Sequence, residues 1–78
     1  MKSTDLIELP IIMYNIKEKH KILVYSINNM YLTAVALSNN MGKSYGEISD
    51  YFVEDFCIFI GNLTEKDLIL INKYKKNQ

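Results

Sequence analysis

The chain has 78 residues, 49% of them apolar, with 3 Gly and 1 Pro, which is enough for one domain and too apolar for a disordered chain. Nine Lys balance nine acidic residues and Arg is absent, so no net charge attracts nucleic acid or an anionic membrane, and both are disfavoured as partners. With Cys57 as the single cysteine, neither an internal disulfide nor a thiolate metal cage is expected. We therefore predict one cytoplasmic domain spanning residues 1–78, without a signal peptide or membrane span.

The first predicted element is a strand over residues 6–16, which are apolar and rich in β-forming side chains. Pro10 lies inside this run. Because proline cannot donate a hydrogen bond to a neighbouring strand, it predicts an edge position in the sheet. The polar residues 17–20 that follow are predicted to form a turn, and His20 at its end is expected to be solvated.

A β-hairpin is predicted next, from two β-branched and aromatic runs at residues 21–27 and 30–38. They flank Asn28 and Asn29, and an Asn pair tolerates the positive φ of a two-residue loop. This loop fixes the predicted pairs, which are Ile22 with Val35, Val24 with Thr33, and Ser26 with Tyr31. Both faces of the hairpin are apolar, so we expect the C-terminal helix to cover one face. Either the N-terminal segment or a second copy of the chain, which would make a homodimer, is expected to cover the other.

Residues 39–62 allow two interpretations. The apolar side chains between Ile48 and Ile60 follow helical spacing, and Gly61 would end such a helix. The run from Phe56 to Ile60 has strong β composition instead. On that basis we predict two strands, at roughly residues 44–51 and 55–61, and a helix remains the alternative.

The C-terminal segment is predicted to form an amphipathic helix. Thr64 is an N-cap residue, and Asp67 three residues later completes a pair that resembles a capping box. Leu63 and Leu68 occupy the positions of a hydrophobic staple, and lysines at the far end suit the negative end of the helix dipole. The β-branched residues within 67–72 leave a strand as the alternative. The predicted fold class is thus α+β, a small antiparallel β-meander of three to five strands with one C-terminal helix.

Residues that carry chemistry in other proteins stand alone in this sequence. Residues 41–44 contain Gly-Lys-Ser, but the first glycine of a phosphate-binding loop is missing, because Leu37 occupies its position. His20 has no second His, Cys or carboxylate at metal-ligand spacing. Cys57 is expected to be buried and inert, and its alternative role as a nucleophile would require activation by His20. We therefore predict a non-enzymatic protein without a cofactor or metal.

The acidic residues are gathered in one part of the sequence. Residues 44–65 contain five acids and no Lys, whereas residues 66–78 carry four Lys against one Asp. Aromatic side chains alternate with these acids, a composition suited to a protein interface that attracts a basic partner. The predicted partner-binding residues are Tyr45, Glu47, Asp50, Tyr51, Glu54 and Asp55. The alternative is a solvated acidic edge whose aromatic rings point into the core.

The runs "YLTAVALS", "YGEI", "FCIFIGN" and "LTEKDLILINKY" resemble small hairpin-plus-helix proteins carried by phages and integrating elements of AT-rich bacteria. The size and layout are also similar to those of small anti-CRISPR proteins. The resemblance implies an inhibitor that binds a host defence or nucleic-acid-handling protein, and it implies no catalytic residues. The expected partner is thus a protein, such as a basic nucleic-acid-binding protein. A single-stranded nucleic-acid-binding domain that stacks bases on sheet tyrosines is the alternative.

Overall fold

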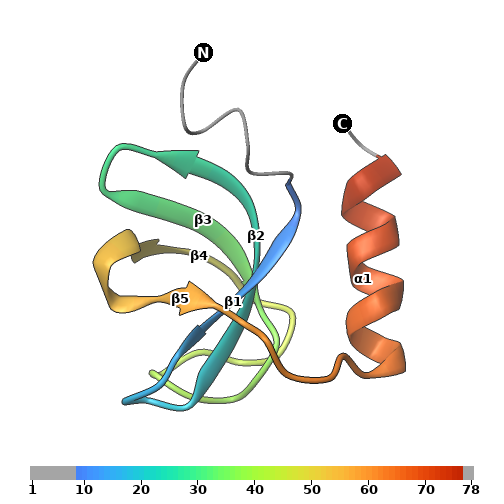
Figure 1. The fold of residues 1–78 in the computed structure, drawn as a ribbon, viewed down its shortest axis with the longest axis horizontal. Helices are drawn as coiled ribbons and strands as arrows, with labels where there is room; N and C mark the ends of the chain where they lie inside the picture. The colour runs from blue at the N-terminus through green and yellow to red at the C-terminus, as the bar shows by residue number, and fades with distance from the viewer. Residues whose placement is uncertain (1–8, 77–78) are drawn as a thin grey trace.

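The structure, a computed structural model, describes residues 9–76 as one antiparallel sheet and a C-terminal helix (Figure 1). The strands lie in the order β4-β3-β2-β1-β5, so that the first four form a meander and the fifth returns to pair with the first. The elements are β1 (Ile11–Asn15), β2 (His20–Asn28), β3 (Tyr31–Ala36), β4 (Ile48–Phe52), the 3-10 helix η2 (Val53–Asp55), β5 (Cys57–Ile58) and α1 (Glu65–Lys76). The predicted α+β class is confirmed.

The sheet is strongly curled, because a short connection joins its two outer strands. In a flat sheet β4 and β5 would lie four strand spacings apart, or about 19 Å. Only four residues connect them, and three of these form η2, which rises only about 2 Å per residue. Within this connection the Phe56 N–H donates to the Val53 carbonyl at 3.2 Å. The sheet therefore has to bend, and Figure 1 shows the connection between β4 and β5 at one side of it.

The inner face of the curl holds one of two hydrophobic cores. Its buried residues come from β2, β3, β4 and the end of the short connection: Ile22, Val24, Leu32, Ala34, Tyr51 and Phe56. The rings of Tyr51 and Phe56 meet edge to face, with centroids 5.2 Å apart. Ile11 and Met13 of the N-terminal segment, one of the two covers predicted for this face, pack against this core. Leu9 packs against this core, while residues 1–8 of that segment lie outside the described residues.

The outer face of the sheet is covered by α1 (Figure 1). The sheet residues buried there are Ile12, Leu23, Val35 and Leu37. From the helix, Leu70, Ile71 and Tyr74 pack against them. Tyr25 of β2 stacks on Tyr74 with ring centroids 5.2 Å apart. The helix therefore covers one of the two apolar faces of the hairpin, as predicted.

The helix α1 begins at the predicted cap. The Thr64 N–H donates to Asp67 Oδ2 at 3.1 Å, and the Asp67 N–H donates to Thr64 Oγ1 at 3.2 Å, which is a reciprocal capping box. Asp67 is 2% exposed, and its Oδ2 also accepts a hydrogen bond from Lys21 Nζ at 2.7 Å. This ion pair ties the start of the helix to β2, a contact that the sequence did not indicate. Leu63 and Leu68, the predicted staple, are both exposed.

The predicted hairpin is present, but its loop lies one residue further along the chain. Asn28 pairs with Tyr31, so the loop consists of Asn29 and Met30, and Asn29 has a φ of 40°. The pairing shifts between Val24 and Ser26, which identifies a β-bulge at the residue between them. The predicted pairs were therefore wrong by one residue before the bulge and by two residues after it.

The bulge at Tyr25 changes which side chains face the helix. In a regular strand Leu23, Tyr25 and Ile27 would all share one face of the sheet. With the extra residue, Leu23 and Tyr25 pack toward α1, whereas Ile27 packs against the inner core. The bulge thus explains how one strand supplies apolar side chains to both cores.

Replacing Asn28 or Asn29 with glycine tests the position of the hairpin loop. Asn29 has a positive φ, where glycine is unstrained, whereas Asn28 is the last residue of β2. Asn29→Gly is expected to change the free energy of unfolding by less than about 0.5 kcal/mol, and Asn28→Gly to lower it by about 1 kcal/mol. Urea denaturation of both variants measures the difference. A larger loss for Asn29→Gly would contradict the observed loop.

Three strand positions differ from their predictions. The strand β1 lies between β2 and β5, so the edge position predicted from Pro10 was wrong. Pro10 precedes the paired residues of β1, where its missing N–H removes no bond from the sheet. The strands predicted at 44–51 and 55–61 are both present, but shorter, as β4 and β5. Residues 44–47 form a loop in which Gly46 has a φ of 89°.

Candidate functional site

The six residues predicted to bind a partner lie at three different places along β4. Tyr45 and Glu47 belong to the loop before β4, Asp50 and Tyr51 to the strand, and Glu54 and Asp55 to η2 after it. Because the strand is extended, the loop and η2 lie at its opposite ends. The predicted acidic surface therefore separates into three parts with different surroundings.

Tyr51 is a core residue rather than a surface residue. Strand alternation turns its side chain inward, where it is 5% exposed, so it is not the exposed aromatic group that was expected. Its hydroxyl lies 3.1 Å from His20 Nε2, a buried contact. Burial raises the pKa of Tyr51 above its ordinary value of 10.0, and the Glu47 carboxylate adds to this effect. The hydroxyl is therefore neutral at neutral pH.

At the loop end of β4, the aromatic and acidic groups already contact lysines of the same chain. Tyr45 is 41% exposed, and Lys66 Nζ lies 5.9 Å from the centre of its ring. Glu47 Oε2 lies 4.0 Å from Lys43 Nζ, and its Oε1 accepts a hydrogen bond from the Ser44 N–H at 3.0 Å. The nearby lysines therefore offset part of the negative charge that was predicted around Tyr45 and Glu47.

In the middle of β4, Asp50 points outward between two exposed apolar side chains. Ile48 and Phe52 flank it on the same face of the strand, and Phe52 stacks on Tyr31 with centroids 5.1 Å apart. Asp50 Oδ1 accepts a hydrogen bond from Thr33 Oγ1 at 2.9 Å. A charge at the centre of an outer strand disfavours pairing with a strand of another molecule. Asp50 is therefore a charged residue of the kind that keeps an edge strand from pairing.

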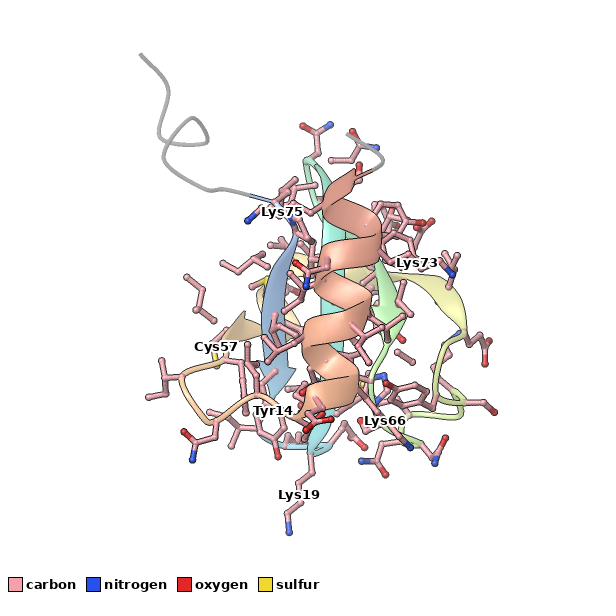
Figure 2. The ribbon with its side chains drawn as sticks, turned by 90° about the vertical axis from the view of Figure 1, so that its right-hand side faces the viewer. Tyr14, Lys19, Cys57, Lys66, Lys73 and Lys75 are labelled. Carbon is pink, nitrogen blue, oxygen red and sulfur yellow. The ribbon has the colours of Figure 1, made fainter. Side chains whose placement is uncertain are left out.

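The third part of the acidic stretch borders a groove over β1 and β5, lined by residues 14–17 and 54–61, which we call the β5 groove. It consists of two adjoining hollows of about 260 and 290 Å³ that share Tyr14, Ile16 and Cys57. Glu54 and Asp55 line the first hollow, and apolar groups line almost all of the second. Figure 2 shows Tyr14 and Cys57 on one side of α1 and Lys66 and Lys73 on the other.

Three isoleucines of the β5 groove are widely exposed. Ile16 is 72% exposed, Ile58 55% and Ile60 95%. Neighbouring aliphatic side chains left uncovered in this way commonly mark a surface for another molecule. The predicted site did not include them, because it was chosen for acidic and aromatic residues and these three side chains are neither. The run from Phe56 to Ile60 directly follows Glu54 and Asp55 in the sequence, and this was the one signal that connected it to the predicted site.

His20 and Cys57 occupy environments opposite to those predicted. His20, expected to be solvated, is fully buried, and Cys57, expected to be buried, is exposed. The Nδ1 atom of His20 lies 2.9 Å from Ser38 Oγ, and its Nε2 lies 3.1 Å from the Tyr51 hydroxyl. Cys57 Sγ instead points to the Tyr14 carbonyl oxygen at 3.5 Å. With both ring nitrogens engaged elsewhere, His20 does not activate Cys57.

The chain of contacts from Ser38 through His20 to Tyr51 holds strands together. Ser38 Oγ also accepts a hydrogen bond from the Lys21 N–H at 2.9 Å, which ties β2 to the second residue after β3. Burial lowers the pKa of His20 below its ordinary value of 6.5, and the Lys43 cation lowers it further, so the ring is neutral at neutral pH. None of the three side chains lines the β5 groove. Within residues 9–76 no three His, Cys, Asp or Glu are grouped to hold a metal ion.

The tyrosines of the strands each lie against another aromatic ring of the chain, and Tyr14 of β1 lies against Phe59. Tyr25 lies stacked on Tyr74 beneath α1, Tyr51 lies in the inner core, and Tyr31 lies against Phe52. Lys21 of β2, a cation that could otherwise contact a phosphate, is paired with Asp67. The described residues therefore provide no observation in favour of base stacking on the sheet.

Comparison with known proteins finds no matching family model, no matching curated protein and no matching solved structure. Over the described residues 9–76, no helix has both the length and the apolar character needed to cross a membrane. The functional inference therefore depends on the geometry of the β5 groove and its acidic border.

Proposed function

We propose that this protein is a non-enzymatic binding factor that captures another protein through the β5 groove. The observation that carries the proposal is the exposure of Ile16, Ile58 and Ile60 around one apolar hollow. Complete burial of an isoleucine side chain contributes roughly 1.5–3 kcal/mol. Three such residues supply a substantial part of a binding free energy when the partner has a complementary shape.

The acidic border of the groove indicates the chemistry of the partner. Glu54 and Asp55 are exposed at one end, and Lys17 is the single basic residue among the lining residues. Acidic groups beside an apolar contact attract and orient a basic partner. The proposed partner therefore presents apolar side chains next to Lys or Arg, as nucleic-acid-binding proteins do. In the cytoplasmic phage setting implied by the sequence resemblance, such a contact would inhibit a host defence or nucleic-acid-handling protein.

Two double variants with the same change of charge test this proposal. Glu54→Lys/Asp55→Lys reverses the border of the groove, and Glu47→Lys/Asp50→Lys reverses the acids of the loop and β4. All four side chains are exposed and lie outside both cores. Capture of protein from a host lysate, quantified by mass spectrometry, is expected to fall about tenfold or more for the first variant and to stay within about twofold for the second.

Thermal unfolding of both variants checks that the fold is retained. Equal capture by the wild type and Glu54→Lys/Asp55→Lys would contradict the β5 groove as the binding surface. Loss confined to Glu47→Lys/Asp50→Lys would move the binding surface to β4 and its preceding loop. Capture that disappears after nuclease treatment would indicate nucleic acid rather than protein as the primary ligand.

A further inference from the structure

The backbone of β5 indicates how the groove holds its partner, an inference that rests on the proposed function. The Phe59 N–H donates to the Ile12 carbonyl of the β1 side at 3.0 Å. In an antiparallel pair, the N–H and C=O of one residue point to the same side, and those of the next residue point to the other side. Ile58 lies between Cys57 and Phe59, which face β1, so its N–H and C=O point away from β1. Since β5 is the outermost strand, these groups form a free edge.

This edge is short, because β5 spans two residues and the Phe59 N–H extends its pairing by one, but it carries none of the chemical features that protect an outer strand. Charged side chains, proline and bulges keep free edges from pairing with other chains. The opposite outer strand, β4, has Asp50 at its centre and Glu47 before its start. Residues 56–60 contain neither a charge nor a proline, and Ile58 and Ile60 are widely exposed. Of the two outer strands, β5 is thus the one open to a further strand.

We propose that an extended segment of the partner protein adds to β5 as an antiparallel strand. Antiparallel pairs outnumber parallel pairs, and a strand in this orientation runs from Ile60 toward Glu54 and Asp55. Alternate apolar residues of the segment lie in the β5 groove, and Lys or Arg residues that follow them reach the two carboxylates. Backbone hydrogen bonds provide affinity in this mode of binding, and the side chains provide specificity.

A second copy of this chain fits the same edge less well. A two-fold axis at Ile58 would set Asn62 and Gly61 of the second copy opposite Glu54 and Asp55. Neither of these residues is charged, so both carboxylates would lack a cationic partner. The charge pattern therefore favours a different protein with basic residues over self-association.

A pool of short synthetic peptides tests strand addition on the wild-type protein. Each peptide carries alternating apolar residues followed by two lysines, and fluorescence anisotropy selects the peptide that binds most tightly. Methylation of every second backbone nitrogen in the register that faces β5 is expected to weaken binding about tenfold or more, because the groups of β5 lose their partners. Methylation in the other register is expected to have little effect. Bound peptide is expected to protect the Ile58 amide from hydrogen exchange.

Two substitutions of Ile58 separate the contribution of its backbone N–H to peptide binding from that of its side chain. Ile58→Pro removes the outward N–H of β5, whereas Ile58→Ala shortens the side chain and keeps the N–H. Binding of the selected peptide is expected to be lost in Ile58→Pro and to weaken severalfold in Ile58→Ala. Thermal unfolding of both variants verifies the fold, and the methylated peptides give the same information if Ile58→Pro does not fold.

Three results would each overturn strand addition: no binding from the whole pool, equal losses in the two variants, or equal effects of the two methylation registers. If Glu54→Lys/Asp55→Lys still abolishes protein capture, the proposed function stands and only the mode of binding is wrong. A wild-type dimer in sedimentation that Ile58→Pro dissociates would assign the edge to a second copy, and it too would overturn the proposal.

Discussion

Asp67→Ala is expected to lower the free energy of unfolding by about 3 kcal/mol or more. Asp67 is 2% exposed, and its Oδ2 accepts hydrogen bonds from both Lys21 Nζ and the Thr64 N–H. Its removal leaves the Lys21 ammonium, whose side chain is 16% exposed, without a counter-ion. The start of α1 loses half of its capping box at the same time. Urea denaturation followed by circular dichroism measures the change.

Thr64→Ala separates the two roles of Asp67. This variant removes the hydroxyl that accepts the Asp67 N–H and leaves the Lys21–Asp67 ion pair in place. Loss of an N-cap alone is expected to lower the free energy of unfolding by about 1 kcal/mol. If Asp67→Ala were no more destabilising than Thr64→Ala, the ion pair would contribute nothing to the attachment of α1.

Mild acid is expected to destabilise the protein through His20. Burial, together with the Lys43 cation, holds the pKa of His20 below 6.5 in the folded state, whereas the unfolded chain takes up the proton near 6.5. Between the two pKa values the unfolded chain binds more protons, so stability is complete above about pH 6.5 and declines as the pH falls toward the folded-state pKa. One proton changes the free energy of unfolding by at most about 1.4 kcal/mol per pH unit. Urea midpoints at several pH values between about 5 and 7 measure the decline.

His20→Gln provides the control for this acid sensitivity. Glutamine does not titrate, so the variant is expected to be less stable than the wild type but to lose little further stability over the same pH range. Tyr51→Phe, which removes one hydrogen-bond partner of His20, is expected to retain the sensitivity. An unchanged pH dependence in His20→Gln would show that another group is responsible.

Local signals were sufficient to predict the C-terminal helix. Thr64 and Asp67 are three residues apart, so their mutual hydrogen bonds depend on nothing outside one turn of helix. The role of Asp67 toward Lys21 was invisible, because 46 positions separate the two residues. Local sequence therefore predicted the start of α1 but not its attachment to the sheet.

The hairpin was predictable, and its register was not. Asn28 and Asn29 both tolerate positive φ, so composition did not distinguish two adjacent loops. The bulge at Tyr25 has no glycine or other local signature, and it moves Ile27 to the opposite face. Before the bulge the register is shifted by one residue, so Ile22 shares a face with Ala34 and Ala36 rather than with Val35, its predicted partner.

Predictions of burial failed where burial depends on distant strands. His20 follows a charged turn, yet its partners Ser38 and Tyr51 come from later parts of the chain. Cys57 lies in the most apolar run, yet that run forms an outer strand. The β5 groove was missed for the same reason, because it exists only where residues 14–17 meet residues 54–61. Of the six residues predicted to bind a partner, two, Glu54 and Asp55, line this groove.

The order of the strands implies that β5 pairs with β1 only late in the synthesis and folding of the chain. Each of β2, β3 and β4 pairs with the strand made just before it, but Tyr14 and its neighbour Cys57 are 43 positions apart. Long-range pairs form late, because a larger loop has to close first. A nascent or proteolytically shortened chain that ends before Phe56 leaves one side of β1 bare and the inner core uncovered. If the proposed function holds, incomplete chains are expected not to compete with the finished protein for its partner, because they lack the β5 side of the groove.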